Sequence, residues 1–244
     1  MVLLLHGFGE DNQVWKEQVD FLSPHFRLIV PDTPGSGGSG LIPNANIETY
    51  AEVVREIMIH ELAAVPATEQ TFSFIGHSMG GLIALETAAR YPDFPAGLVV
   101  METPIAPPAP FVEGLRQFAG ALQTSMYREA VVQFLNQFIG FGDDPGRRSE
   151  VMNGMLGFVQ HVGASSLESY VSYDTIAAAA ACKVPILYIS AGFGFADLAR
   201  FKELTPQLMV AQTVGSGHYH QLEVPDQVNA MIERFIAVSG GDAR

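Results

Sequence analysis

The residues around Ser78 have the types and the spacing that a nucleophilic serine requires. The run Gly76-His77-Ser78-Met79-Gly80 follows the apolar segment 72–75 and precedes a helical pattern that begins at Gly81. A serine between a strand and a helix lies on a sharp turn, and the two glycines let the flanking backbones approach each other. Free amides at the start of that helix favour a developing negative charge. The run predicts that Ser78 is the nucleophile of an acyl transfer.

A second run predicts the backbone donors that this chemistry needs. His6-Gly7-Phe8-Gly9 ends the first apolar segment, and its small residues let the backbone approach a substrate. We expect the amides of Phe8 and Met79 to form an oxyanion hole, where each donor stabilises the transition state by about 3 kcal/mol. The side chains of His6 and His77 are interpreted as structural.

A serine hydroxyl also needs a base, and His218 is the predicted one. The run Val214-Gly215-Ser216-Gly217-His218 follows the last predicted strand and precedes the closing helix, which places it at the same sheet edge as Ser78. His220 is a competitor, but the glycine before His218 suits a loop turned toward the site. A metal site built from these two histidines lacks a third ligand, so we expect neither metal nor cofactor.

Short apolar runs alternate with longer amphipathic stretches along the chain. The runs predict buried strands, and the stretches predict helices, for example after Asn46 and from Pro225. This alternation predicts an α/β fold with a doubly wound, mostly parallel sheet of about six strands. The predicted strands are 2–5, 26–30, 72–75, 98–101, 186–189 and 208–211.

The alternation stops at the proline-rich run 104–110, which we interpret as a stiff connector incompatible with helix. Helical patterns at 111–123, 127–139 and 147–162 follow, before strands resume at Val184. We therefore predict a core of residues 1–103 and 183–244 and an all-helical cap of residues 104–182. The apolar cap side chains either wall a substrate pocket or only pack the insert against the sheet: Phe118, Met126, Phe134, Phe138, Met152, Met155 and Phe158.

Composition limits the possible partners. The 244 residues carry a formal net charge of −13, which argues against nucleic acid and anionic membrane surfaces and favours a neutral or weakly charged small molecule. No apolar run has the length of a signal peptide or a membrane span, so we expect a soluble, cytoplasmic protein.

The single cysteine, Cys182, has no partner for a disulfide and is interpreted as structural. The oligomeric state is not predicted.

Together these runs resemble the α/β-hydrolase superfamily, particularly its capped lipase, esterase and C–C hydrolase branch. The resemblance covers nearly the whole chain and includes the run 31–39 and Gly217-His218 followed by Glu223-Val224-Pro225. It implies the α/β-hydrolase fold and a Ser-His-acid triad. A serine at position 78 argues against the haloalkane dehalogenases and epoxide hydrolases of the superfamily, which use aspartate there.

The acid of the triad departs from the family's common pattern. In most members it follows the penultimate strand in a Gly-x-x-Asp turn, but Phe195 stands at that position and Asp197 comes two residues later. A minority branch takes its acid from the end of the strand before the cap, which is Glu102 here. A carboxylate buried at that edge needs a partner such as an imidazole. We favour Glu102, with Asp197 as the rival.

The sequence also begins in the His-Gly strand, whereas the family commonly has a β-hairpin before it. A sheet of six strands, with an edge that needs cover, is therefore expected.

These residues predict a serine hydrolase that cleaves a small to medium carboxylic ester through an acyl-enzyme, with Ser78, His218 and Glu102 as the triad. The same residues would also serve lactone opening, thioester cleavage, C–C bond hydrolysis, perhydrolysis or cofactor-free oxygenation. A non-catalytic receptor of the same fold is a further alternative, which the intact Ser78 and His218 disfavour.

Overall fold

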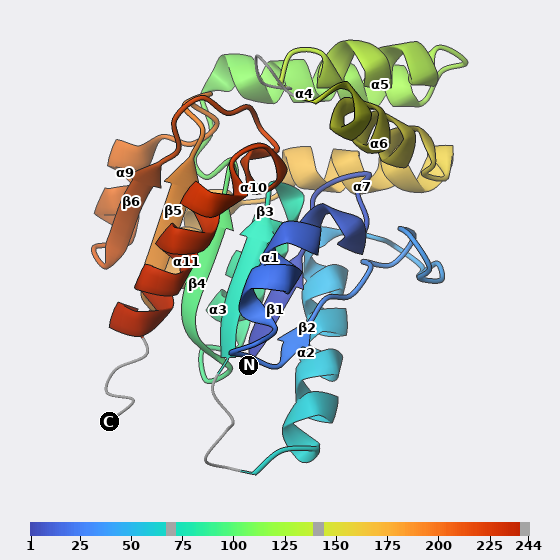
Figure 1. Ribbon diagram of the computed structural model, residues 1–244. Coiled ribbons are helices and arrows are strands. Elements are labelled where there is room, and N and C mark those ends of the chain that lie inside the picture. The colour runs from blue at the N-terminus through green and yellow to red at the C-terminus, as the bar shows by residue number, and fades with distance from the viewer. Residues whose placement is uncertain (67–71, 139–143, 240–244) are drawn as a thin grey trace.

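A six-stranded, all-parallel sheet forms the centre of the molecule (Figure 1), with the strand order β2-β1-β3-β4-β5-β6. The computed structural model describes residues 1–66, 72–138 and 144–239. The predicted fold class is confirmed, and each strand falls on a predicted run. The strands are β1 (Val2–Leu5), β2 (Leu28–Ile29), β3 (Phe72–His77), β4 (Pro95–Met101), β5 (Ile186–Ser190) and β6 (Leu208–Gln212).

Helices cover both faces of the sheet, which explains why the central strands are apolar throughout their length. One face carries α1 (Lys16–Leu22) and α11 (Pro225–Ser239), and the short helices η1 (Asn12–Trp15) and α10 (His220–Glu223) pack beside α1. On the other face α2 (Ile47–Ala63), α3 (Met79–Arg90), α8 (Thr175–Ala181) and α9 (Leu198–Leu204) pack in a row. Among the described helices, none combines the length and the apolar composition that crossing a bilayer requires.

The edge strand β2 is shorter than predicted. Only Leu28 and Ile29 pair with β1, through Val2 and Leu3, although the apolar run extends over residues 26–30. Both strand residues are half-buried, because an edge strand has a neighbour on one side only.

Four helices of the insert lie above the carboxyl ends of the strands, as Figure 1 shows. They are α4 (Ala109–Leu122), α5 (Tyr127–Leu135), α6 (Pro145–Leu156) and α7 (Gln160–Ser172). The predicted helical insert is confirmed. Helix α8 falls within the predicted cap range but packs against α3 and α9, so the boundaries at 103/104 and 182/183 stay a prediction.

Details of the insert differ from the sequence-based expectation. Pro110 lies in the first turn of α4, where a missing N–H costs no helical hydrogen bond, so the proline-rich connector ends earlier than predicted. The single helix expected over 147–162 is two helices, because α6 ends at Leu156 with Gly157 as its C-cap and α7 begins after Val159. Helix α5 ends at Leu135, and its expected extension reaches residue 139, which lies outside the described residues.

Backbones meet directly where β3 passes into α3. A Cβ atom on Gly80 would lie 2.1 Å from the carbonyl oxygen of Leu5, and one on Gly76 would lie 2.4 Å from that of Gly80. These distances leave no space for any side chain. The two glycines of the Gly-x-Ser-x-Gly run therefore set how closely β1, β3 and α3 can pack.

Gly80→Ala is expected to lower the free energy of unfolding by about 3 kcal/mol, because the new methyl group would force rigid backbones apart. Gly120→Ala on α4 is the matched control, since nothing lies within 4 Å of its Cβ position. This control should gain about 0.5–1 kcal/mol through better helix propensity. Urea denaturation followed by circular dichroism measures both, and equal stabilities would contradict the packing argument.

Candidate active site

Ser78 occupies the turn between β3 and α3 in a strained conformation. Its φ of 51° and ψ of −118° lie outside the regions that non-glycine residues prefer, at a cost of about 1–3 kcal/mol. The surrounding structure holds it there, because the Ser78 amide donates to the Met101 carbonyl at 2.8 Å and its own carbonyl accepts from Gly81 at 3.0 Å. The serine is half-buried at the carboxyl edge of the sheet.

The two predicted oxyanion donors come from different elements near this serine. Met79 is the first residue of α3, where backbone amides have no acceptor within the helix. Phe8 follows the end of β1 and lines the same cavity as Ser78. A carbonyl carbon placed at Ser78 would thus have backbone N–H groups from two elements nearby.

His218 and Glu102 face each other at this edge of the sheet. The distance from His218 Nδ1 to Glu102 Oε2 is 3.7 Å, longer than a hydrogen bond, and both atoms are buried without another hydrogen-bond partner in the described structure. Catalytic hydrogen bonds are often long before substrate binds. The second oxygen, Glu102 Oε1, accepts from the Ala191 amide at 2.5 Å and from the Ser190 hydroxyl at 3.4 Å.

Burial gives this pair unusual protonation behaviour. Glu102 is 1% exposed, and burial raises the pKa of its carboxyl group to about 7, although the Ala191 amide and the charge of His77 oppose the rise. Burial also lowers the pKa of His218 well below its usual range, with a further lowering by His77. His218 is therefore a neutral imidazole at neutral pH, ready to accept a proton.

The competing residues lie elsewhere. Asp197 is exposed and caps α9 by accepting from the Arg200 amide at 2.9 Å, and it does not line the cavity. Phe195, which stands where the family's acid is expected, packs the edge of its ring against His218 with centroids 5.2 Å apart. His220 is buried in α10 beside Thr213, also away from the cavity.

The cavity that joins these residues is small and mostly apolar. Its free volume is about 30 Å³, room for about two water molecules. Of the apolar cap residues considered above, Phe134, Phe138 and Met155 line it, whereas Met126 is 57% exposed. Among the described residues, the lining consists of Phe8, Glu10, Ser78, Glu102, Phe111, Leu115, Phe134, Leu135, Phe138, Met155, Leu167, Tyr170, Phe195, His218 and Tyr219.

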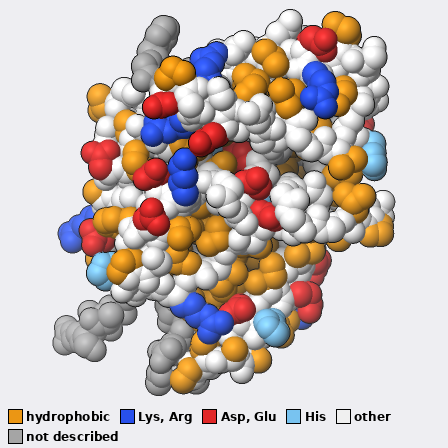
Figure 2. Space-filling view, turned by 45° about the vertical axis from the view of Figure 1, so that its right-hand side comes forward, with side chains coloured by type: hydrophobic (Ala, Val, Ile, Leu, Met, Phe, Trp, Pro, Cys, Tyr) orange, Lys and Arg blue, Asp and Glu red, His pale blue; other side chains and the backbone are white. Residues whose placement is uncertain are grey.

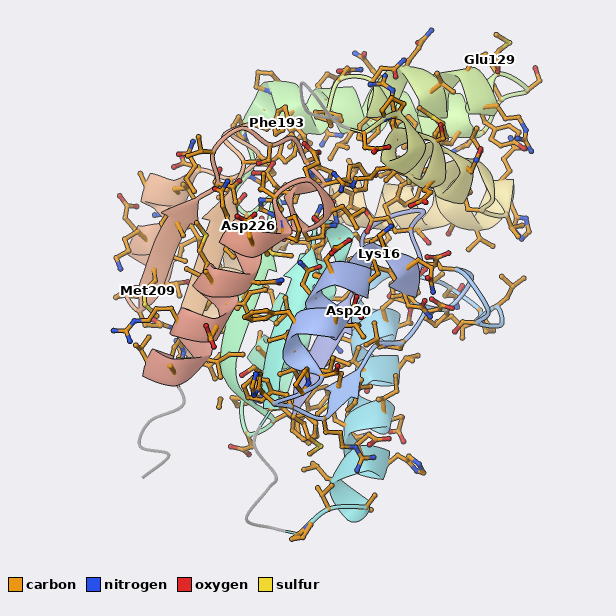
Figure 3. The ribbon with its side chains drawn as sticks, in the orientation of Figure 1. Lys16, Asp20, Glu129, Phe193, Met209 and Asp226 are labelled. Atoms are coloured by element: carbon orange, nitrogen blue, oxygen red, sulfur yellow. The ribbon has the colours of Figure 1, made fainter. Side chains whose placement is uncertain are left out.

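Aromatic side chains form a wall between the cavity and the outside of the cap. Phe138 contacts Phe134, Phe193 and Phe195, with centroid distances of 4.8, 5.9 and 5.2 Å. Figure 3 shows Phe193 beneath α4, on the loop that follows β5. The Phe138 carbonyl also accepts from the His218 amide at 2.7 Å, so the cap contacts the loop of the predicted base directly.

Sequence reasoning missed several residues of the cavity, among them Tyr170 and Glu10. Tyr170 on α7 lines the cavity from the cap, where the Ser78 side chain partly offsets the rise that burial causes in the pKa of its phenol, and no local pattern could have placed it there. Glu10 also lines the cavity, and its signal was an acidic residue directly after the run His6-Gly7-Phe8-Gly9. Within the described residues, no three His, Cys, Asp or Glu side chains gather as a metal site.

A model of the family described as "alpha/beta hydrolase fold" matches residues 1–145 of the sequence. The chain belongs to the α/β-hydrolase family. Among curated relatives, pimeloyl-[acyl-carrier protein] methyl ester esterases are 36% identical over 100 residues in Vibrio vulnificus and 34% over 102 residues in Yersinia enterocolitica. These matches cover 41% and 42% of the chain but only 35% and 36% of the esterases, about a third of their length.

Solved structures match over nearly the whole chain. A thermophilic esterase from Thermogutta terrifontis has a TM-score of 0.84 at 24% identity, covering 98% of this chain and 89% of the esterase. An enol-lactonase from Burkholderia xenovorans has a TM-score of 0.84 at 22% identity, covering 97% and 90%. At these identities the likeness establishes the fold alone.

Glu102→Gln is expected to stabilise the protein above about pH 7 by about 3 kcal/mol. A carboxyl group whose pKa rises from 4.5 to about 7 on folding binds its proton more tightly in the folded state, so stability falls as pH rises through that interval. Below it the group is neutral in both states, and the gain should vanish. Urea denaturation at a series of pH values tests this, and a gain independent of pH would contradict it.

Proposed function

We propose that this α/β-hydrolase is a serine hydrolase that cleaves a small to medium carboxylic ester through an acyl-enzyme. One observation carries the proposal: Ser78, on its strained turn, shares an apolar cavity with His218, and the ring of His218 faces the buried Glu102. The similarity to methyl ester esterases over part of the chain supports the same bond type.

The proposed chemistry proceeds in two steps. Ser78 Oγ attacks the ester carbonyl while His218 takes its proton, and the Phe8 and Met79 amides bind the oxyanion that forms. The protonated His218 then gives its proton to the departing alcohol. Water repeats the sequence on the acyl-enzyme and releases the acid. Glu102 stabilises the imidazolium form of His218 during both steps.

The walls of the cavity favour an uncharged substrate. Two carboxyl groups, those of Glu10 and Glu102, line it and oppose an anion, and the lining that the structure describes contains no Lys or Arg. Acidic and basic side chains are interspersed on the face that Figure 2 shows, with hydrophobic side chains between them. Because the free volume is only about 30 Å³, the aromatic wall must move for any ester to enter, which favours a compact acyl group.

Ser78→Ala is expected to lower the hydrolysis of p-nitrophenyl butyrate by at least about 1,000-fold, because the nucleophile is removed. It should also abolish labelling by a fluorophosphonate probe. Ser149→Ala, which changes an exposed serine on α6, is the matched control and should retain full activity. Unchanged hydrolysis by Ser78→Ala would refute the proposed function.

The assignment of the acid is tested by comparing two amide substitutions. Glu102→Gln should reduce kcat by about 10,000-fold, because His218 loses its charged partner. Asp197→Asn should stay within about two-fold of the unaltered enzyme, because asparagine caps a helix as well as aspartate does. Steady-state kinetics measures both, and the reverse order of effects would assign the acid to Asp197.

A further inference from the structure

A second buried pair of titratable groups, Glu10 and His77, lies beside the proposed triad. His77 Nδ1 lies 3.0 Å from Glu10 Oε1, and the two side chains are 0% and 3% exposed. Glu10 Oε2 accepts from the Gly7 amide at 2.7 Å. The proposed acyl transfer assigns no role to either side chain.

The contacts of His77 show that its ring donates from both nitrogens. Nε2 lies 3.0 Å from the carbonyl oxygen of His218, which can only accept, and Nδ1 faces the carboxylate of Glu10. Burial alone would lower the pKa of His77 and raise that of Glu10, but their mutual attraction, together with backbone hydrogen bonds and neighbouring charges, outweighs burial and shifts both pKa values the opposite way. The pair is therefore an imidazolium facing a carboxylate.

This pair connects three segments of the proposed site. Glu10 holds the amide of Gly7, next to the predicted donor Phe8, and His77 directly precedes Ser78 in the chain. The bond from His77 to the His218 carbonyl holds the loop of the base. We propose that Glu10 and His77 are positioning residues whose ion pair holds the oxyanion loop, the nucleophile turn and the base loop in one arrangement. The role rests on the proposed ester hydrolysis.

A purely stabilising role explains the pair less well. Removing two charges from water costs about as much as their attraction returns, so a buried ion pair adds little net stability. Its distinctive property is geometric, because each partner also bonds to backbone of a different loop. The His77 ring also lies 4.5 Å from that of His218, close enough to affect the triad electrostatically.

The charge of His77 acts on both proposed triad partners. It lowers the pKa of Glu102 against the larger rise that burial causes, and it adds to the larger lowering that burial causes in the pKa of His218. The other titratable groups around the pair are His6, which acts on Glu10, and His220 and Tyr219, whose rings lie 6.4 and 5.5 Å from that of His77. Loss of the His77 proton would raise both pKa values and would therefore move the acidic limb of the pH profile of kcat/KM to higher pH.

The first test is Glu10→Gln in the full chain, which keeps an acceptor for the Gly7 amide but removes the charge that protonates His77. We expect kcat for p-nitrophenyl butyrate to fall by roughly 10- to 100-fold, as misplaced catalytic groups do, with KM within about two-fold. The acidic limb of kcat/KM should move to higher pH. Glu86→Gln is the control, because Glu86 is a buried carboxylate on α3 that bonds to Arg90 and Tyr173 away from the cavity.

Two substitutions of His77 separate its two bonds. Glutamine can place its amide nitrogen near the position of Nε2 and keep the bond to His218, whereas asparagine can reach only the position of Nδ1. If the bond to His218 positions the base, His77→Gln should retain several-fold more kcat than His77→Asn. Equal losses in the two variants would overturn this part of the proposal.

Nitrogen-15 NMR of histidine-labelled protein tests the ion pair independently of any activity measurement. In a pH titration both ring nitrogens of His77 should keep their protons to higher pH than those of an ordinary histidine, and Glu10→Gln should lower the pH at which the ring becomes neutral. A His77 ring that loses its proton at or below the pH of an ordinary histidine, or unchanged kcat and pH profile in folded Glu10→Gln, would overturn the proposal. Failure of the unaltered protein to react with a fluorophosphonate would instead overturn the proposed function, and the positioning role with it.

Discussion

The direct backbone contact between the end of β1 and the start of α3 is the constraint on which the site depends. Because Gly80 rests against the carbonyl groups of Leu5 and His6, the turn that carries Ser78 cannot shift without moving the strand that leads to Phe8. His6 extends this constraint, since its Nε2 accepts from the Thr33 amide at 2.9 Å and ties β1 to the loop after β2. Main-chain packing thus fixes the turn of the nucleophile against the end of β1, and side chains such as that of His6 link these elements to the surrounding loops.

The neighbouring strand supplies a carboxylate under similar strain. Glu102 has a φ of 46° and follows β4 directly. Its amide donates to the Ile189 carbonyl of β5, and its carboxylate accepts from the amide of Ala191, the residue after β5. An acid placed after β4 leaves the turn after β5 free to carry Phe195, whose ring packs on His218. The strain and the burial both oppose folding, as expected where a residue is retained for its position rather than for stability.

Short-range patterns in the sequence were sufficient to predict the fold, and they also supplied the candidate residues of the site, whose roles stay a prediction. The Gly-x-Ser-x-Gly run, the apolar strands and the glycine before His218 each depend on neighbours in the chain, and parallel topology then brings their ends together. The ion pair of Glu10 and His77 depends on packing between residues 67 positions apart, so no local pattern revealed it. The break at Gly157 was missed because residues 147–162 keep a helical period across it.

The cap creates the electrostatic state of the site as well as its walls. Burial is the largest cause of the raised pKa of Glu102 and of the lowered pKa of His218, and the cap's Phe134, Phe138 and Tyr170 line the cavity that both residues share. Any movement that enlarges the cavity admits water and returns both pKa values toward their ordinary ranges. Because the His218 amide is bonded to the Phe138 carbonyl, such a movement also releases the base from the cap. The contacts that cover the cavity and the contacts that hold the base loop are therefore the same ones, so the position of the cap and the protonation of the site are coupled.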